Sequence, residues 1–382
     1  MALNQIFRKT IPPGAIRLRA VGDVNWGMGI GRKLRWEPGF APLPGLQATL
    51  GAASVAFFNA ECTPVADSAK FQGAHAMFAP AAFLDRLREE FNVVNIANNH
   101  ILDAGEEAFA ETLTELQRRQ FVIVGGGLNL ADACGLRMVT VQGLRVGFLG
   151  CADFMHTPDR RGNHAGRRKP GVWIYQPRQL LKHIRACRRQ VDVLICSLHT
   201  GLEFHRAPDP GLVREARRMI AAGAHVILIH HAHVRRGLEF YQHGLIAYNL
   251  GNFMFDLADP YMQQPGAATN IGLILDIFLE PQGVAGYEFW LAHIQADGAT
   301  TVLTDVHQAE AWYHEQLRLN EQLAHPDLLR QEWRHACRTV LKSRYYASYW
   351  AFERQEYRRF FYLLWDLQRR ENRRWLLGLI GM

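Results

Sequence analysis

Polar residues that could bind a metal follow several separate apolar runs of the sequence. Asp23 ends the run RLRAV within the turn GDVN, and Glu61 comes directly after VAFFNA. A single acid after a strand is more often a turn former or a helix cap than a ligand, so neither residue alone predicts a site. If these runs are strands of an α/β domain, however, both carboxylates face the crevice at the carboxyl ends of the strands, where such proteins bind ligands.

A third group is the segment VVNIANNHILDAG, in which Asn98, Asn99 and His100 follow one apolar run and precede an amphipathic stretch. Adjacent amide and imidazole side chains provide a hard oxygen ligand and a group that titrates near neutral pH. The alternative is an Asx turn that caps the next helix, with Asp103 sharing that role. We favour a chemical role for the group as a whole.

Three histidines complete the candidate set. His199 ends VDVLICSLHTG, and His231 and His233 end GAHVILIHHAH. Spacing of i and i+2 predicts that the last two imidazoles lie on one face of an extended segment. A structural role is the better interpretation of any one histidine. Imidazole, carboxylate and amide ligands together predict a site for one or two divalent ions such as Mn, Fe or Zn.

The elements that must position these residues are predicted from periodicity. Residues 17–299 alternate short apolar runs with amphipathic stretches, which is typical of an α/β domain. Many strands in the second half, with a hairpin near Val141–Leu144, favour a mixed two-sheet sandwich over one doubly wound sheet. Helical periodicity then replaces the strands, so we expect a domain of residues 1–304 and a helical extension of residues 305–382. The strands are expected at Arg17–Val24, Ser54–Asn59, Val93–Ala97, Phe121–Val124, Met138–Val141, Arg145–Gly150, Val191–Leu198, Val226–Ile229, Leu245–Leu250, Gly272–Phe278 and Tyr287–His293, and the helices at Pro80–Glu90, Gly105–Arg119, Pro177–Arg189 and Pro208–Ala222.

Across roughly residues 17–256, six motifs resemble the CapA family, which is named for poly-γ-glutamate capsule synthesis. They are GDV, FFNAEC, NIANNHILDAG, SLHTGLEF, GAHVILIHHAHV and LIAYNLGNFMFD. CapA-like proteins are similar to calcineurin-type metallophosphoesterases. The resemblance therefore implies a four-layer α/β/β/α sandwich that holds two metals at its strand ends.

The resemblance also implies roles for single residues. His100 matches the catalytic histidine beside the metals, and the metal ligands would be Asp23, Glu61 as the bridging carboxylate, Asn99, His199, His231 and His233. Where the phosphoesterase pattern begins Asp-x-His, this chain has Asp23-Val24-Asn25, and we keep Asn25 as a substrate-binding candidate. Because an amide oxygen binds a dication more weakly than an imidazole, one metal position is expected to be weak or empty. This departure argues against ordinary phosphoester hydrolysis.

Further substrate-binding candidates lie outside the ligand motifs. The segment 156–171 lacks apolar periodicity and is predicted to be a long mobile loop and a candidate lid. Its basic residues suit the capture of a carboxylate or phosphate, although a solvated surface loop is an equal alternative. In LGNFMFD, a buried loop held by hydrogen bonds is favoured over catalysis, and Asn252 remains a candidate for substrate contact. The basic candidates are Arg160, Arg161, Arg167 and Arg168.

We therefore expect a metal-dependent enzyme that acts on a peptide-like or polyglutamate-like anionic substrate. Polymer biosynthesis, hydrolysis of an amide or phosphoester, and epimerisation of a peptide residue all remain open. The alternative from another class is a non-catalytic subunit of a capsule-polymer synthesis complex.

Composition limits the partners and the location. The formal net charge of +7 resides in residues 334–382, which hold eleven Lys and Arg against four Asp and Glu. Because the body is neutral, no nucleic-acid groove is expected. The aromatic, basic tail is expected to pack on the core or at a homodimer interface, with a peripheral membrane contact as the rival. Six scattered cysteines and the lack of a signal-like or membrane-spanning apolar stretch favour a cytoplasmic protein.

Overall fold

Two β-sheets packed face to face form the body of the protein. The computed structural model describes residues 14–67, 77–153 and 163–353. The first sheet has the order β18-β17-β16-β1-β2-β5-β6, with β15 paired to β1, and the second has the order β13-β14-β12-β11-β9-β8. The strands of the first sheet are β1 (Ile16–Val24), β2 (Val55–Ala60), β5 (Val93–Asn95), β6 (Val122–Val124), β15 (Asn252–Met254), β16 (Ile271–Glu280), β17 (Gly283–Ile294) and β18 (Thr300–Leu303). Those of the second are β8 (Arg137–Val141), β9 (Leu144–Ala152), β11 (Val193–His199), β12 (Val226–His230), β13 (Leu238–Tyr241) and β14 (Gly244–Ala247).

Alternation along the strands builds three apolar layers. In β2, Phe57 faces the second sheet, where its ring lies 6.2 Å from that of Phe148 on β9, whereas Phe58 faces the other way and packs on Phe91 at 5.0 Å. Successive side chains of a strand point to opposite faces, so one strand supplies both layers. A third layer lies on the outer face of the second sheet.

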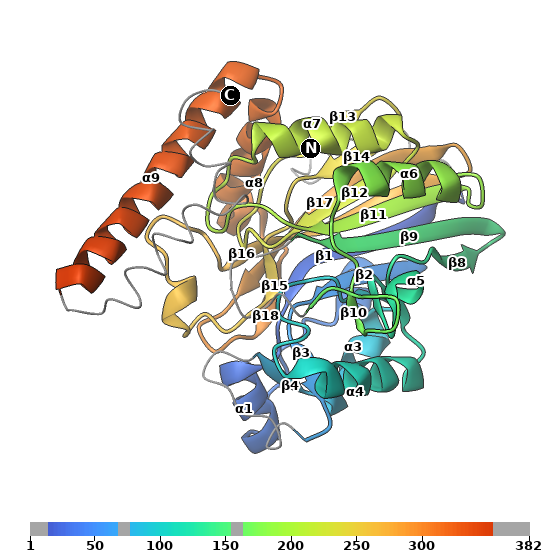
Figure 1. Cartoon of the computed structure of the whole chain (residues 1–382), viewed down its shortest axis with the longest axis horizontal. Helices are drawn as coiled ribbons and strands as arrows, with labels where there is room; N and C mark the ends of the chain where they lie inside the picture. Colours follow the sequence, from blue (N-terminus) through green and yellow to red (C-terminus); the bar gives the residue numbers. More distant parts are fainter. Residues whose placement is uncertain (1–13, 68–76, 154–162, 354–382) are drawn as a thin grey trace.

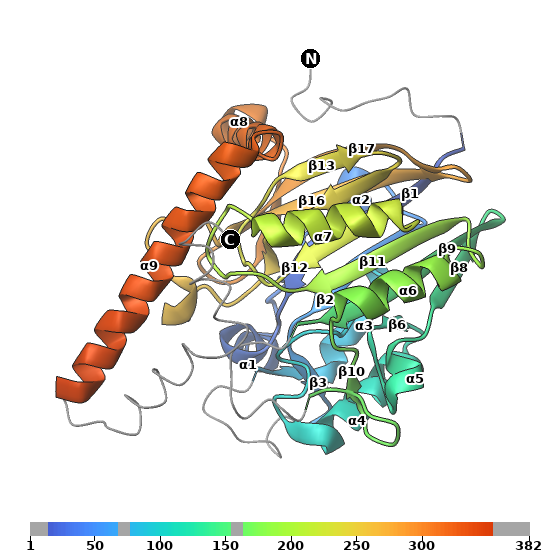
Figure 2. The same ribbon diagram turned by 45° about the horizontal axis from the view of Figure 1, so that its top comes forward.

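Helices cover both outer faces of this sandwich, as Figures 1 and 2 show. On α7, Leu212, Ala216 and Met219 are buried at helical spacing against the second sheet. The expected four-layer α/β/β/α sandwich is therefore confirmed. The helices beside the first sheet include α1 (Met28–Trp36), α2 (Leu46–Leu50), α3 (Leu84–Glu90) and α4 (Gly105–Arg118), and the second sheet carries α6 (Pro177–Cys187) and α7 (Pro210–Ala221), with α5 (Leu130–Ala133) nearby.

Every strand and helix whose range was predicted from the sequence is present, most of them with shifted ends. Helix α7 begins two residues later than predicted, because the Asp209 side chain accepts the Gly211 N–H and so caps the helix there. Helices α1, α2 and α5 were not predicted, nor were several short strands whose two or three residues are too few to show a period. These are β15 and four strands outside the two large sheets, β3 (Thr63–Val65), β4 (Phe78–Pro80), β7 (Gly126–Gly127) and β10 (Gly171–Val172). The four-residue strands β13 and β18 were not predicted either.

The segment 156–171, predicted to be one long mobile loop, contains a paired turn and the start of strand β10 in its second half. Residues 154–162, which include Arg160 and Arg161, lie outside the described residues. The following segment is tied down: Gly166 and Lys169 pair in a turn, β10 pairs with β7, and the Gly166 carbonyl accepts the Leu130 N–H. Backbone pairing with a glycine strand leaves no apolar period in the sequence. This turn carries Arg167 and Arg168, both exposed, beside α4 and α5.

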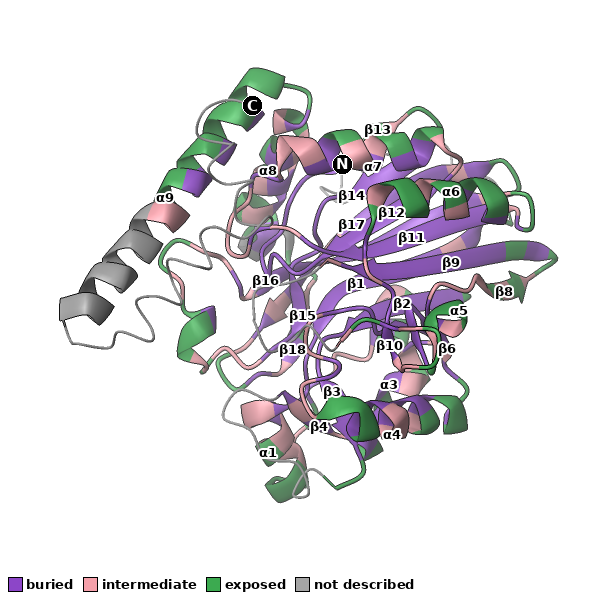
Figure 3. Cartoon of the chain, in the orientation of Figure 1, coloured by how far each residue is buried: buried purple, intermediate pink, exposed green. Residues whose placement is uncertain are grey.

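Two helices follow the sandwich, α8 (Val306–Gln322) and α9 (Pro326–Glu353). Tyr313 of α8 joins the layer between the sheets, and Leu329 of α9 joins the layer under α7. Trp333 and Cys337 pack on Leu202, and Figure 3 shows buried positions along the first half of α9. The described side chains of the extension thus pack on the body. Within the residues that the structure describes, no helix is long and apolar enough to cross a bilayer.

Candidate metal centre

Four strand ends from the two sheets converge on one buried cluster. Asp23 is the second-last residue of β1, Glu61 follows β2, and His199 ends β11. His231 follows β12, which runs parallel to β11 with His199 opposite His230. Because β1 and β2 are also parallel, both sheets present carboxyl ends here, as the sequence predicts.

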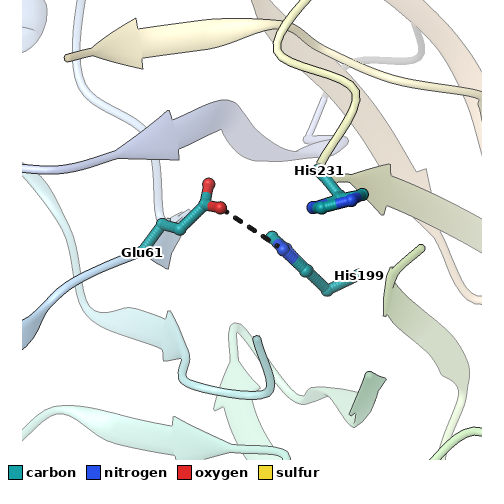
Figure 4. A group of neighbouring side chains, drawn as sticks. All are labelled: Glu61, His199 and His231. Atoms are coloured by element: carbon teal, nitrogen blue, oxygen red, sulfur yellow. Dashed lines mark ion pairs between the residues drawn. The ribbon is translucent and has the colours of Figure 1, made fainter. Parts of the chain in front are cut away.

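Three groups of side chains place possible ligand atoms within 4.8 Å of one another. Glu61 belongs to two of them, and His231 and His233 each also belong to two. Figure 4 shows Glu61 and His231 on either side of His199, whose Nε2 lies 3.4 Å from Glu61 Oε1. The groups are Asp23 with Glu61 and His233, Glu61 with His199 and His231, and Glu203 with His231 and His233.

His231 and His233 come together through a turn. Their φ angles are 93° and 57°, in the left-handed region that side chains other than glycine rarely adopt. The prediction of an extended segment with both rings on one face is therefore wrong, although the rings still lie 5.9 Å apart. Asp23 stabilises this backbone by accepting the His231 N–H through Oδ2 at 3.1 Å. Strained residues of this kind cluster at functional sites.

Buried polar partners surround Asp23. Asn59 Nδ2 donates to Asp23 Oδ1 at 2.8 Å and is itself held by Asn95, whose Nδ2 donates to Asn59 Oδ1 at 2.8 Å. His230 Nδ1 lies 3.3 Å from Asp23 Oδ1. Burial raises the pKa of Asp23, but the hydrogen bond and charge of His230 outweigh it and hold that pKa below its usual range. Asp23 is therefore a carboxylate near neutral pH.

The surroundings of His199 orient its imidazole and lower its pKa. Its Nε2 lies 2.8 Å from Asn99 Oδ1, and its Nδ1 lies 3.2 Å from Asn59 Nδ2. Burial lowers the pKa of His199 well below its usual value, even though the charge of Asp23 acts in the opposite direction. The imidazole is therefore neutral, which is the form that binds metals. Asn99 Oδ1 is close enough to share an ion with it.

The segment Asn98–Asp103 contains both the Asx turn and the candidate chemical group that its sequence suggested, on different residues. Asn98 forms the Asx turn, since its Oδ1 accepts the N–H groups of His100 and Ile101 at 3.0 Å. The N-cap position of α4 is Ala104, and Asp103 precedes it. The Asp103 Oδ2 lies 2.8 Å from His100 Nδ1, and the residue before His100 is Asn99, whose Oδ1 lies 2.8 Å from His199 Nε2. His100 thus lies beside the cluster.

Two predicted substrate contacts are engaged in local structure. Asn25 Oδ1 accepts the Gly27 N–H at 2.8 Å, and its Nδ2 lies 2.9 Å from the sulfur of Met77. Asn252 Oδ1 lies 2.9 Å from His233 Nδ1, and its Nδ2 donates to the Thr269 carbonyl at 3.1 Å. Asn252 therefore orients a candidate ligand, in the hydrogen-bonded loop that its sequence favoured.

Glycine lets this loop approach β1. A Cβ on Gly22 would lie 1.8 Å from the Gly251 oxygen, which accepts the Asp23 N–H at 3.0 Å. The Asn252 loop thereby lies directly against the strand that carries Asp23.

Four residues of the site were missed by the sequence reasoning: Asn59, Asn95, Glu203 and His230. Asn59 and Asn95 are polar residues inside apolar strands, and His230 is the first histidine of IHHAH, so each left a signal. Glu203 stands within LEF after the predicted ligand His199. An acid in a loop shows no pattern that separates it from a solvated one.

The donor set fits divalent metal ions. Asp23, Glu61, His199 and His231 are fully buried, and His233 is 1% exposed. Buried carboxylates are costly unless they are paired or coordinate a metal. Mixed oxygen and imidazole donors suit first-row dications, so the cluster suggests divalent metal binding.

Solved structures with a distant similarity include a calcineurin-like phosphoesterase YfkN from Bacillus subtilis, with 13% identity, a TM-score of 0.42, and coverage of 79% of this chain and 98% of that one. A 5'-nucleotidase from Candida albicans SC5314 has 10% identity and a TM-score of 0.40, and the match covers 83% of this chain and 58% of that one. Similarities this distant carry no argument about ligands or reaction.

Relatives by sequence are closer. The capsule biosynthesis protein CapA of Bacillus anthracis is 34% identical over 170 residues, which are 44% of this chain and 40% of that protein. The PGA biosynthesis protein CapA of Bacillus subtilis (strain 168) is 34% identical over 167 residues, 44% of this chain and 43% of that one. A probable polyglutamine synthesis accessory protein of Mycobacterium tuberculosis is 32% identical over 174 residues, 43% and 45% of the two chains. These matches span less than half the length of each relative.

The family described as bacterial capsule synthesis protein PGA_cap matches residues 17–257. That region contains every residue of the buried cluster and both sheets up to β15. This chain therefore belongs to the family of bacterial capsule synthesis proteins, PGA_cap.

Proposed function

We propose that this chain is a metal-dependent enzyme that acts on an anionic peptide-like or polyglutamate-like substrate. The observation that carries the proposal is the buried carboxylate of Glu61, which belongs to two ligand groups at once. One carboxylate shared by two sets of donors is the arrangement of a two-metal site.

The residues divide between two metal positions. Asp23, Glu61 and His233 would hold one ion, and Glu61, His199 and His231, with Asn99, the other. A bound ion there would polarise a carbonyl or phosphoryl oxygen or lower the pKa of water.

His100 is the candidate for proton transfer. Its side chain is 13% exposed, whereas that of His199 is fully buried, so His100 can meet a substrate from solvent. Asp103, 4% exposed, holds His100 Nδ1 at 2.8 Å and thereby fixes the ring, so that Nε2 is the nitrogen for exchange. Such a carboxylate both orients an imidazole and stabilises its protonated form.

The substrate class is supported by the names of the relatives and by one departure in the site. Capsule and polyglutamine synthesis are the processes in those names. Asn25, which stands where the phosphoesterase pattern Asp-x-His has its histidine, is engaged with Gly27 and Met77. This departure from the pattern argues against ordinary phosphoester hydrolysis.

The first experiment measures Mn, Fe and Zn in protein purified from metal-replete cultures. We expect one or two equivalents in the wild type and their loss in His199→Ala, with His314→Ala as the control because its ring is exposed on α8. Absence of any transition metal from the wild type would overturn the proposal.

The second experiment tests catalysis with short γ-glutamyl oligomers in D₂O, followed by mass spectrometry. Fragments would show hydrolysis, and gain of deuterium at Cα would show proton abstraction, as epimerisation requires. His100→Ala should retain its metal and lose about 10²–10⁴-fold in rate. A metal-loaded protein whose turnover is unchanged by His100→Ala would contradict the catalytic role, and one that binds the oligomers without converting them would favour the non-catalytic subunit.

A further inference from the structure

Glu203 lies at the solvent side of the metal centre, on the loop between β11 and α7. Its Oε1 is 3.9 Å from His231 Nε2 and also 3.9 Å from His233 Nε2. Its side chain is 19% exposed, whereas those of Glu61 and His231 are fully buried. Of these three side chains, only that of Glu203 is reached by solvent.

These distances suit two ligands of one ion. At 3.9 Å the atoms are too far apart for a hydrogen bond. Donors that each lie about 2.1 Å from a shared metal are roughly 3–4 Å from one another. Glu61 Oε1 is 3.8 Å from His233 Nε2, so His233 has the two carboxylates at nearly equal distances. Glu203 and Glu61 are therefore equally well placed to share a metal ion with His233.

The carboxylate is held in this orientation by aromatic neighbours. Tyr261 donates its hydroxyl to Glu203 Oε2 at 2.5 Å, which leaves Oε1 toward the histidines. The Tyr261 ring packs on Phe204 at 5.2 Å, and Phe204 stacks on His233 at 5.7 Å. Phe204 has a φ of 61°, a strained conformation of the kind found at His231 and His233.

A buried arginine fixes the backbone on both sides of Glu203. Arg236 is fully buried and donates to the Leu202 carbonyl at 2.7 Å and to the His205 carbonyl at 2.9 Å. The Phe204 N–H also donates to the Ala232 carbonyl at 2.8 Å, which ties this loop to the histidine turn. Burying a guanidinium is costly, so its use here indicates that the loop position matters.

Helix α8, outside the family match, reinforces both loops. Glu315 pairs with Arg206, which lies on the same loop as Glu203. It also pairs with Arg235, two residues after His233, at 2.6 Å. Gln316 donates to the Arg236 carbonyl at 2.9 Å. One helix thereby sets the distance between Glu203 and the histidines.

We propose that Glu203 is a further ligand of the metal centre, and that Glu315 is a positioning residue that acts through it. The inference rests on the proposed function, because it requires that the cluster bind metal. Glu203 adds a second carboxylate beside His233, whereas the Asn25 side chain is engaged with Gly27 and Met77 and belongs to none of the three ligand groups.

The test titrates metal-depleted full-length protein with Mn²⁺ and measures affinity and stoichiometry by calorimetry. Glu203→Gln keeps the shape of the side chain and removes its charge. We expect it to weaken Mn²⁺ binding at least about tenfold or to remove one equivalent. Glu215→Gln is the matched control, because Glu215 likewise accepts a tyrosine hydroxyl, that of Tyr175 at 2.6 Å, but lies on α7 outside the cluster.

The role of Glu315 is tested by combining it with the first change. Glu315→Gln should weaken Mn²⁺ binding in the wild type and have little further effect in Glu203→Gln, because it acts through that side chain. Additive losses would overturn the positioning role. Melting in the presence of chelator shows for each variant whether folding itself has changed.

The outcomes separate the two proposals. A wild type that binds no Mn²⁺, Fe²⁺ or Zn²⁺ would overturn the proposed function and this inference with it. A wild type that binds metal while Glu203→Gln binds it with the same affinity and stoichiometry would overturn the assignment of Glu203 alone.

Discussion

Replacement of Glu61 by Gln separates the stability of the fold from that of the metal centre. Glu61 is fully buried, and its Oε1 lies 3.4 Å from His199 Nε2 and 3.8 Å from His233 Nε2. In metal-depleted protein, Glu61 and Asp23 are two carboxylates buried in one cluster. Removing one charge relieves their repulsion and the desolvation of Glu61, so the variant should be at least as stable as the wild type in chelator.

Metal reverses this order. An ion at a hundred times its dissociation constant stabilises the native state by about 2.7 kcal/mol for each filled position. At about 2 °C for each kcal/mol, one filled position raises the melting temperature by roughly 5 °C and two raise it by roughly 10 °C. Because Glu61 belongs to two ligand groups, Glu61→Gln should lose most of this rise.

The assay is thermal unfolding of both proteins in chelator and in excess Mn²⁺. The order of the melting temperatures should reverse. The variant melts at the same temperature as the wild type or higher in chelator, and at a lower temperature than the wild type in Mn²⁺. An equal Mn²⁺-induced rise in both proteins would refute the shared-ligand reasoning. A variant that is strongly destabilised in chelator would show instead that Glu61 is a structural residue.

Three further predictions concern the body and the extension. Asp276→Asn removes the charge that pairs with the Arg19 guanidinium, which is 1% exposed and lies 2.7 Å from Asp276. Urea unfolding should show a decrease in the free energy of unfolding of about 3–5 kcal/mol, and a decrease under about 1 kcal/mol would contradict this reasoning. Truncation after Asp305 uncovers the apolar surfaces under α8 and α9 and should give aggregation or a lower melting temperature; a soluble, fully active truncation that no longer sediments with anionic vesicles would favour membrane contact. Burial, together with the charge of Arg188, lowers the pKa of His225 from 6.5 to about 4. As the pH falls from 6.5 to 4, the unfolded chain therefore takes up a proton that the folded protein does not, and the free energy of unfolding should decrease by up to about 3 kcal/mol. His225→Gln should flatten the urea midpoint over this pH range, and an unchanged profile would contradict the assignment.

Local pattern alone determined the two sheets and the type of ligand at each strand end. The runs before Asp23, Glu61 and His199 are apolar and short, so they must be buried strands, and a polar residue that follows each is placed at the sheet edge whatever the rest of the chain does. Parallel strands then bring these edges together. For that reason the cluster could be assembled from the sequence before its geometry was known.

The tertiary structure decided what no local pattern contains. The turn in which His231 and His233 adopt positive φ is held by a long-range contact, since Asp23, more than 200 residues earlier, accepts the His231 N–H. Glu203 meets the histidines because Arg236 and α8 hold two loops that are distant in sequence. Periodicity reports which face of a strand or helix is buried, whereas the meeting of two loops depends on long-range hydrogen bonds and ion pairs, which leave no period in the sequence.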